Sequence, residues 1–282
     1  MSSVSEPKPG VSLQAFYIPS SFGHLAAVYQ TPCAGVPHVW DLLFIHAFAH
    51  EHYVARPVMA SAWRRLAAEG IGVLSLDLPG CGDSAGDFGE ASWETWLSAV
   101  SIAYQWLTCN SSQEILVGGL RLGATLALQA AANVDAKGLL LLQPVIRGDE
   151  MMTQFLRLRV AFSGLREEVK EKETTQKLRM RIAAGETLEV GGFFLPPELA
   201  LTIDRLDLET QIPHANLPIH WIEAGRSILP RLAHTVDQWR ATGAVVSFTQ
   251  VDVKPYWVHT RGLVSEYGPL IDRISQTFRE HT

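Results

Sequence analysis

The sequence EILVGGLRLGATLALQAAAN, residues 114–133, predicts a strand, a sharp turn and a helix in direct succession. Its apolar run at residues 115–117 is typical of a strand that is buried on both faces. Glycines follow at positions 118, 119 and 123, and most remaining residues are alanine or leucine, which favour a helix. Glycine tolerates strained backbone and lets a helix pack close to a strand. The segment therefore indicates a tight strand–turn–helix unit of an α/β sheet.

The turn has the frame of the G-x-S-x-G motif, which places the nucleophile of α/β-hydrolases between a strand and a helix. Gly119 and Gly123 keep the frame, but Arg121 stands at the central position. A guanidinium stays protonated and offers no lone pair, so Arg121 cannot act as a nucleophile. An acyl-enzyme at this position is excluded. The alternative is that the segment is an unrelated glycine turn in a doubly wound sheet.

Apolar strands and amphipathic helices alternate along most of the chain. Such alternation predicts a mostly parallel central sheet with helices on both faces, as in the α/β-hydrolase fold. Residues 11–149 and 213–282 are expected to form the core, residues 150–212 an inserted cap and residues 1–10 a disordered leader. Strands are expected at residues 11–19, 24–30, 41–45, 71–77, 138–143, 219–223 and 245–251, and helices at residues 57–69, 93–108, 149–162, 229–242 and 263–279.

The composition limits the ligands and the compartment. The 282 residues carry a net charge of -6, so the chain offers no basic field for nucleic acid or an anionic membrane. Its three scattered cysteines do not indicate a disulfide framework or a zinc site. No signal peptide is recognisable, and no apolar run reaches the roughly 18 residues of a membrane span. These features favour a cytoplasmic protein. The Gly-x-Gly-x-x-Gly motif of dinucleotide-binding sites is absent, and we expect no cofactor.

A second glycine turn follows the strand at residues 71–77. Residues 77–84, DLPGCGDS, resemble the D-x-x-G-x-G-x-S turn that α/β-hydrolases carry after the same strand. Cys81 is a conceivable substitute nucleophile, but a small buried residue in a tight turn is the favoured interpretation. Ser84 is better explained as a hydroxyl that stabilises the turn.

Together, residues 77–88, 119–124, 143–145 and 154–159 resemble one family, the second of the hydrolase-like families associated with exosortase A systems. The similarity extends from about residue 41 to the C-terminal helix. The resemblance implies an α/β-hydrolase fold, a cytoplasmic location and a link to exopolysaccharide synthesis and protein sorting. A carrier protein or an exopolysaccharide-system component is then a candidate partner. The resemblance implies no particular substrate.

A serine-hydrolase triad follows the chain order nucleophile, acid, histidine. His259 lies after the last strand, where the histidine is expected, although an ordinary loop histidine is an equal alternative. Ser227 occupies the position after the strand at residues 219–223 where the aspartate is expected. Glu223 and Asp149 are the remaining candidates for the acid, and a structural role is favoured for both.

The loop after the strand at residues 41–45 supplies one backbone N–H of the oxyanion hole in α/β-hydrolases. His46, Ala47 and Phe48 are therefore the candidates from this loop. Leu122, which follows Arg121, is the candidate from the glycine turn.

The same loop is rich in metal-ligating side chains, because it contains His46, His50, Glu51 and His52. The HExxH motif is absent, and on an extended chain Glu51 points away from His50 and His52. Oxyanion-loop or helix-capping roles are favoured, and we expect no metal.

Arg121 is consistent with two arrangements. Beside the backbone N–H groups of a helix start, its charge favours an anion pocket for a carboxylate, a phosphate or a thioester-linked acyl carrier. Alternatively it pairs with an acid such as Glu51 or Asp149 and plugs a dead site.

Two functions follow from these residues. The first is hydrolysis of acyl esters or thioesters without a serine nucleophile, with His259 as the base that activates water. The second is a catalytically inactive protein that retains the pocket and binds a small anionic or acyl ligand as a binding or scaffold protein.

Overall fold

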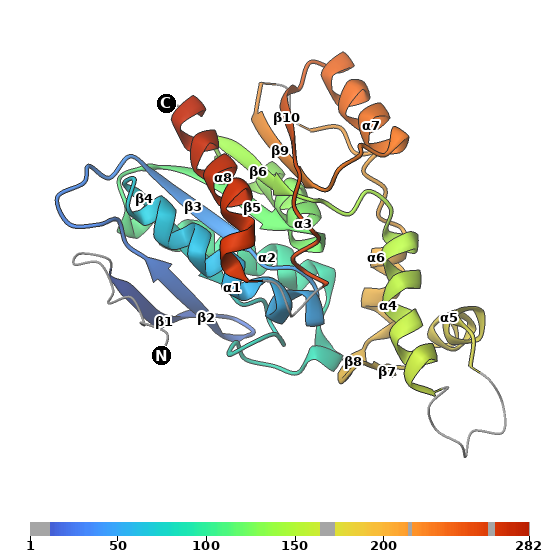
Figure 1. The fold of residues 1–282 in the computed structure, drawn as a ribbon. Helices are drawn as coiled ribbons and strands as arrows, with labels where there is room; N and C mark the ends of the chain where they lie inside the picture. Colours follow the sequence, from blue (N-terminus) through green and yellow to red (C-terminus); the bar gives the residue numbers. More distant parts are fainter. Residues whose placement is uncertain (1–11, 164–172, 214–215, 259–262, 282) are drawn as a thin grey trace, which may run out of the picture.

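The computed structural model describes residues 12–163, 173–213, 216–258 and 263–281. A sheet of eight strands forms in the order β1-β2-β4-β3-β5-β6-β9-β10 (Figure 1). β1 is antiparallel to β2 and β2 to β4, and all other neighbours are parallel. The strands are β1 (Leu13–Ser20), β2 (Gly23–Gln30), β3 (Trp40–Ile45), β4 (Ile71–Leu76), β5 (Glu114–Leu120), β6 (Gly138–Leu142), β9 (Pro218–Ala224) and β10 (Val245–Val251).

The central strands are covered on both faces, which explains their continuous apolar sequences. In β3, Leu43 and Ile45 belong to the hydrophobic cluster on one face of the sheet. Leu42 and Phe44 belong to the cluster on the other face. All four side chains are fully buried.

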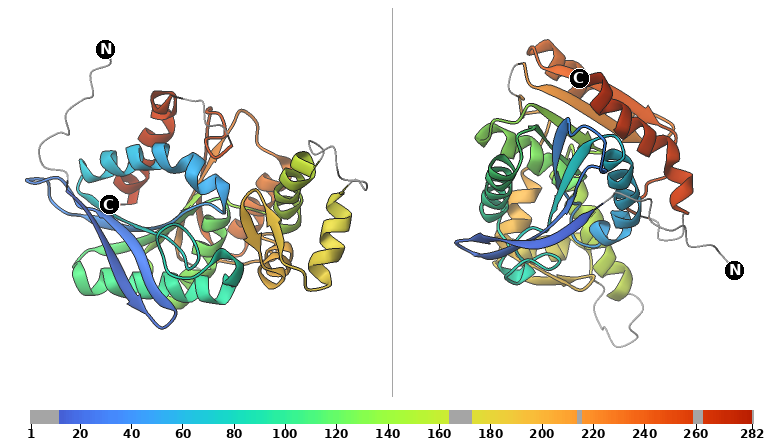
Figure 2. Two further views of the ribbon diagram at one scale, coloured as in Figure 1. Left: turned by 90° about the horizontal axis from the view of Figure 1, so that it is seen from below. Right: turned by 90° about the vertical axis from the view of Figure 1, so that its left-hand side faces the viewer.

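Helices pack on each face (Figure 2). α1 (His50–Ala67) and α8 (Gly268–His281) lie on one face. α2 (Trp93–Asn110), α3 (Leu122–Ala130) and α7 (Pro230–Ala241) lie on the other. The predicted mostly parallel sheet with helices on both faces is thus confirmed. Across the described ranges, no helix combines the length and apolar character that crossing a membrane requires.

The segment between β6 and β9 forms a separate group of elements beside the sheet (Figure 1). It contains α4 (Gly148–Ser163), α5 (Thr175–Ala183), α6 (Pro197–Asp204) and a small antiparallel sheet of β7 (Leu188–Val190) and β8 (Phe193–Leu195). The assignment of residues 150–212 as a cap stays a prediction, and the expected leader at residues 1–10 lies outside the described residues.

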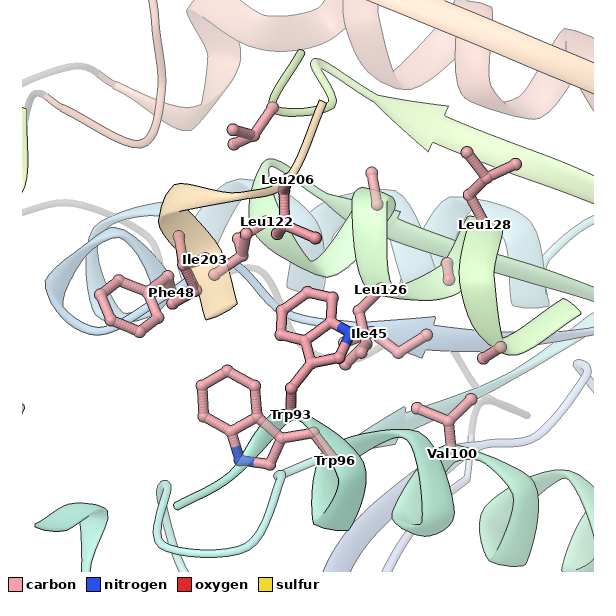
Figure 3. Close-up of a cluster of buried hydrophobic side chains, with 14 of the residues drawn as sticks. Ile45, Phe48, Trp93, Trp96, Val100, Leu122, Leu126, Leu128, Ile203 and Leu206 are labelled. Carbon is pink, nitrogen blue, oxygen red and sulfur yellow. The ribbon is translucent and has the colours of Figure 1, made fainter. Parts of the chain in front are cut away.

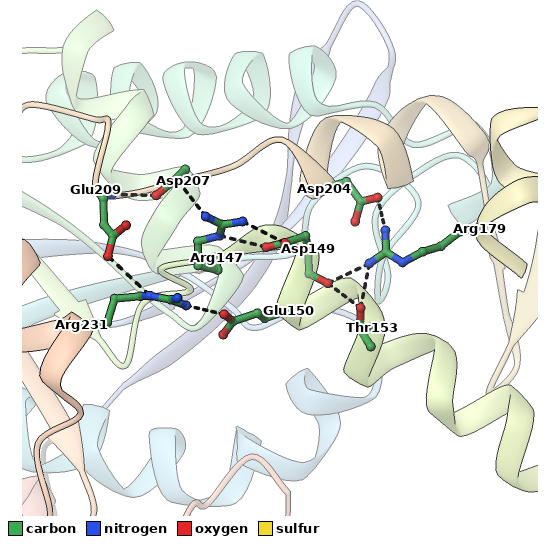
Figure 4. Close-up of polar contacts among 9 residues, drawn as sticks. All are labelled: Arg147, Asp149, Glu150, Thr153, Arg179, Asp204, Asp207, Glu209 and Arg231. Atoms are coloured by element: carbon green, nitrogen blue, oxygen red, sulfur yellow. Dashed lines mark hydrogen bonds and ion pairs between the residues drawn. The ribbon is translucent and has the colours of Figure 1, made fainter. Parts of the chain in front are cut away.

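Ion pairs join the elements of this group to one another and to α7 of the core (Figure 4). The Arg147 guanidinium donates two hydrogen bonds to the Asp149 carboxylate, at 3.0 and 2.9 Å. Arg179 of α5 bonds Asp204 of α6 and the Asp149 carbonyl of α4. Arg231 of α7 pairs with Glu150 of α4. Several of these charges are half-exposed, so the ion pairs add little to the free energy of unfolding. Their main effect is to fix the orientation of the elements relative to one another.

One predicted boundary is wrong in a way that affects the site. The sequence predicts a helix from residue 57, with Pro57 in the first turn, where proline is well tolerated. The structure instead begins α1 at His50 and places Pro57 inside the helix. His50, Glu51 and His52 are therefore in the first helical turn and not in an extended loop. Their side chains consequently point in three directions around the helix axis.

Candidate functional site

The turn between β5 and α3 is strained at Arg121. Its backbone has φ 56° and ψ −121°, a region that side-chain-bearing residues seldom occupy. Two glycines make the turn sterically feasible. A Cβ on Gly119 would lie 2.4 Å from the carbonyl of Gly123, and a Cβ on Gly123 would lie 2.2 Å from the carbonyl oxygen of His46. The start of α3 therefore lies directly against the loop that follows β3.

The Arg121 side chain is held by two contacts. Its Nε donates to Oε1 of Glu51 at 3.3 Å, and both side chains are mostly buried, with exposed fractions of 14% and 12%. The guanidinium carbon lies 5.2 Å from the ring centroid of Trp257, within the range of a cation–π interaction. Of the two acids considered as partners, Glu51 makes the pair. Asp149 binds Arg147 instead.

Glu223 adds a second buried acid near Arg121. It lies near the end of β9, and Nε1 of Trp221 donates to its Oε1 at 2.6 Å. Burial raises the pKa of Glu223 to about 7, although the Trp221 hydrogen bond and the charge of Arg121 act in the opposite direction. At neutral pH this carboxyl is therefore about half protonated, and Glu51 is the acid that contacts Arg121 directly.

An apolar cavity of about 90 Å³ lies beside the turn, under the loop after β3. A single water needs about 10–15 Å³ by the same measure, so the space admits a larger group. Its walls come from α2, α3 and the loop after β3, as the packing of Trp93, Trp96, Phe48, Leu122 and Leu126 shows (Figure 3). Phe193 of β8 also lines the cavity, and its ring lies 5.2 Å from that of Phe88.

A cluster of ionisable side chains forms one wall of the cavity. His46, His52 and Asp77 contribute donor atoms that lie within 4.8 Å of one another. The rings of His46 and His52 are stacked, with centroids 4.2 Å apart. Burial lowers the pKa of both imidazoles. Both rings are therefore held towards the neutral form.

The alternative nucleophiles in the second glycine turn have structural roles. Burial raises the pKa of the Cys81 thiol to about 12, so the reactive thiolate is not populated at neutral pH. Ser84 donates to the Asp77 carbonyl at 2.6 Å and accepts from the Ala26 amide at 2.8 Å. These bonds match the turn-stabilising role expected for Ser84.

The structure brings together only part of the predicted site. Glu223 lies near Arg121, whereas Asp149 is half-exposed in the first turn of α4. His46, Ala47, Phe48 and Leu122 all line the apolar cavity, and their assignment to an oxyanion hole stays a prediction. His259 lies outside the described residues.

Two contributors were missed from the sequence. Trp257 lies two positions before the predicted histidine, and no local signal marks it as a partner of Arg121. Asp77 was interpreted only as part of a turn. Its place beside His46 could have been found from the strand order, because β3 and β4 are parallel neighbours with Ile45 opposite Leu76.

Comparison with known proteins agrees with this geometry. Residues 42–276 match the sequence profile of the Alpha/beta hydrolase family, and the chain belongs to that family. No curated protein sequence matches the chain.

Similar solved structures include Est1E from Butyrivibrio proteoclasticus with bound ferulic acid, at 16% identity and a TM-score of 0.64, covering 95% of this chain and 99% of that one. A carboxyl esterase from Bacillus coagulans has 13% identity and a TM-score of 0.66, covering 95% and 98%. Alpha/beta hydrolase domain-containing protein 10 from mouse has 18% identity and a TM-score of 0.58, covering 95% and 100%. Identities this low show a shared fold alone.

The raised pKa of Glu223 predicts a specific pH dependence of stability. In the folded protein Glu223 keeps its proton up to about pH 7, whereas the unfolded chain releases it near 4.5. The contribution of Glu223 to the free energy of unfolding is therefore fully present below pH 4.5 and is lost as pH rises through 7. It amounts to roughly 3 kcal/mol.

Glu223→Gln keeps an acceptor for Trp221 but cannot ionise. Relative to wild type, we expect this variant to gain roughly 3 kcal/mol between pH 4.5 and 8 in urea unfolding. Glu94→Gln, at an exposed glutamate of α2, is the control and should show no such gain. Parallel pH profiles for Glu223→Gln and wild type would contradict the assignment.

The pairing of Arg121 predicts a second result. Arg121→Ala leaves the Glu51 carboxylate buried without its partner, so the free energy of unfolding should fall by about 2–3 kcal/mol. Arg226→Ala is the matched control. It removes a pair whose side chains are 86% and 67% exposed, and should cost less than about 1 kcal/mol.

The same proteins distinguish a paired arginine from an anion receptor. Melting temperatures are measured in phosphate and in chloride at equal ionic strength. A paired Arg121 gives no phosphate-specific stabilisation of wild type. Phosphate-specific stabilisation that disappears in Arg121→Ala would show that Glu51 yields its place to an anion.

Proposed function

We propose that this member of the Alpha/beta hydrolase family binds an acyl ligand and forms no acyl-enzyme. The observation that carries the proposal is the ion pair of Arg121 with Glu51 at the position where the family motif places its nucleophile. A protonated guanidinium cannot attack a carbonyl carbon. The buried acid opposite it also leaves no surplus positive charge at the turn.

The retained cavity supports an apolar ligand. Aromatic and aliphatic side chains make up most of its lining, including Phe48, Trp96 and Leu126. An alkyl or aromatic acyl chain gains about 25 cal/mol for each Å² of apolar surface that it removes from water there. The fold is compatible with such ligands, since the Est1E structure holds ferulic acid. We place the acyl chain in the cavity and its carbonyl near Ala47 and Leu122.

Hydrolysis of an acyl ester or thioester without a serine is the second candidate. It is favoured by Glu223, whose pKa of about 7 suits a general base. It ranks second because Glu223 does not line the cavity described above. Ester hydrolysis that titrates near pH 7 and is lost in Glu223→Gln would reverse this order.

The biological setting belongs to the proposal as well. The sequence motifs that resemble the exosortase A-associated family support a cytoplasmic role next to exopolysaccharide synthesis. An acyl group presented by a carrier protein is the ligand that best fits both this setting and the apolar cavity. The fold alone does not distinguish a carrier-bound acyl group from a free one.

Phe193 provides the test of acyl binding. Phe193→Asp puts a carboxylate into the apolar wall of the cavity, so binding of a dansyl-labelled hexanoyl amide should weaken at least about tenfold. Fluorescence titration measures the dissociation constant. The probe is neutral, so the result does not depend on Arg121.

The neighbouring residue is a matched control. Phe194 follows on the same strand, points away from the cavity and is 60% exposed. Phe194→Asp adds the same charge at nearly the same place and should change the dissociation constant less than about twofold, since exposed substitutions have small effects. Equal weakening by both variants, or no saturable binding by wild type, would reject the acyl-binding proposal.

A further inference from the structure

The cluster of His46, His52 and Asp77 results directly from the topology. β3 and β4 are parallel neighbours, so the residues that follow them, His46 and Asp77, emerge side by side at the carboxyl edge of the sheet. α1 starts at His50, and His52 in its first turn contributes the third donor atom. Three residues from three separate segments therefore place their donor atoms within 4.8 Å of one another.

Not every polar atom of the cluster has a hydrogen-bond partner among the described residues. The Asp77 Oδ2 accepts a hydrogen bond from the Asp83 amide at 3.1 Å, and this bond fixes the carboxylate in the turn. Its Oδ1 faces Nε2 of His52 at 3.8 Å, which is too long for a hydrogen bond. Nε2 of His52 has no hydrogen-bond partner among the described residues, although the side chain is only 5% exposed.

A buried nitrogen left without a partner costs about 1–3 kcal/mol. Some group therefore is expected to occupy the space between His52 and Asp77 in the working protein. Both residues line the apolar cavity, as does His46, so a group bound there is reached from the cavity.

We propose that His46, His52 and Asp77 bind a divalent transition-metal ion of the zinc type. Two imidazole nitrogens and one carboxylate oxygen match the three-ligand zinc sites of enzymes, in which the fourth position holds water or substrate. Magnesium and calcium prefer sites built from oxygen alone, so the two histidines select against them. The fourth position would open towards the acyl cavity.

Only a small adjustment closes the site. Zinc bonds to nitrogen and oxygen are about 2.0–2.2 Å long, so tetrahedral donors lie about 3.4 Å apart. Donors that now lie within 4.8 Å of one another reach this spacing by side-chain rotation of roughly 1 Å.

The charges around the cluster permit a cation. Asp77 is buried in the cluster, and Asp83 follows it in the same turn. Arg56, the charged group of α1 that influences both histidines, is exposed to solvent, which weakens its repulsion. Asp83 is exposed as well, so its charge and that of Arg56 are both screened, and the buried Asp77 carboxylate is the dominant charge at the site.

Zinc titration of the full chain against a chromogenic chelator tests the site, and cobalt supplies a spectroscopic signature of the ligand set. Wild type should bind one equivalent of either metal, with magnesium in excess having no effect. His52→Phe keeps the stacked ring but removes the ligand, and should weaken zinc binding at least about 100-fold. Asp77→Asn, which keeps an acceptor for the Asp83 amide, should also weaken it.

His50→Phe is the matched control. His50 lies two residues from His52 in the same helical turn, but its ring stacks on Phe155, 6.1 Å away, and is not part of the cluster. The affinity of the His50→Phe variant for zinc should stay within about twofold of that of wild type. Zinc should raise the melting temperature of wild type and His50→Phe but not of His52→Phe, because a ligand stabilises the state that binds it.

Two results would overturn the proposal. Absence of saturable zinc binding by wild type would mean that only water fills the gap beside His52. Equal losses in His50→Phe and His52→Phe would assign binding to the contiguous histidines of α1 and not to the cluster. If His52→Phe fails to fold, the zinc affinity of Asp77→Asn decides whether the cluster binds the metal. Far-ultraviolet circular dichroism then checks that Asp77→Asn is folded. The test does not depend on acyl binding, since zinc is the only ligand present.

Discussion

The close contact between the start of α3 and the loop after β3 is the constraint on which the site depends. No side chain fits between Gly123 and the carbonyl of His46, so the two segments touch through backbone atoms alone. This contact coincides with the strained backbone at Arg121, the residue at the turn between β5 and α3. In the family this geometry exposes a nucleophile. Here it presents a fixed positive charge, which Glu51 and Trp257 contact.

Two different environments lie at this edge of the sheet. On one side, Glu51 pairs with the guanidinium and the Trp257 ring lies against it, while Glu223, with a pKa of about 7, is about half protonated nearby. On the other side, the cavity between α2 and α3 stays apolar apart from the histidine cluster on its wall. The Arg121 guanidinium is thus mostly buried, and the apolar cavity beside it is open to a ligand. This combination supports the proposed acyl binding, and the proposed metal position lies on the wall of the same cavity.

Much of the fold could be predicted from the sequence, because it depends on local signals. The apolar run at residues 115–117 and the glycines after it predicted the unit of β5 and α3. The start of α1 was predicted wrongly, because proline favours the first turn of a helix and Pro57 lies inside this one. That error placed Glu51 in an extended loop, so the sequence could not decide between Glu51 and Asp149 as the partner of Arg121.

The cluster of His46, His52 and Asp77 was hidden for a different reason. The sequence drew attention to neighbouring histidines, whereas the third donor comes from the end of another strand. Only the pairing of β3 with β4 brings Asp77 to His46. Side-chain contacts between segments that are distant in the chain depend on strand order and helix position, which periodicity does not specify.

Reaction with a fluorophosphonate probe, followed by intact-protein mass spectrometry, tests the central claim most directly. Such probes phosphonylate serines that a neighbouring base has activated. With Arg121 at the turn, wild type should gain no mass under conditions that fully label a serine esterase run in parallel. Stoichiometric addition to any serine of this chain would reveal a working nucleophile elsewhere and would contradict the account.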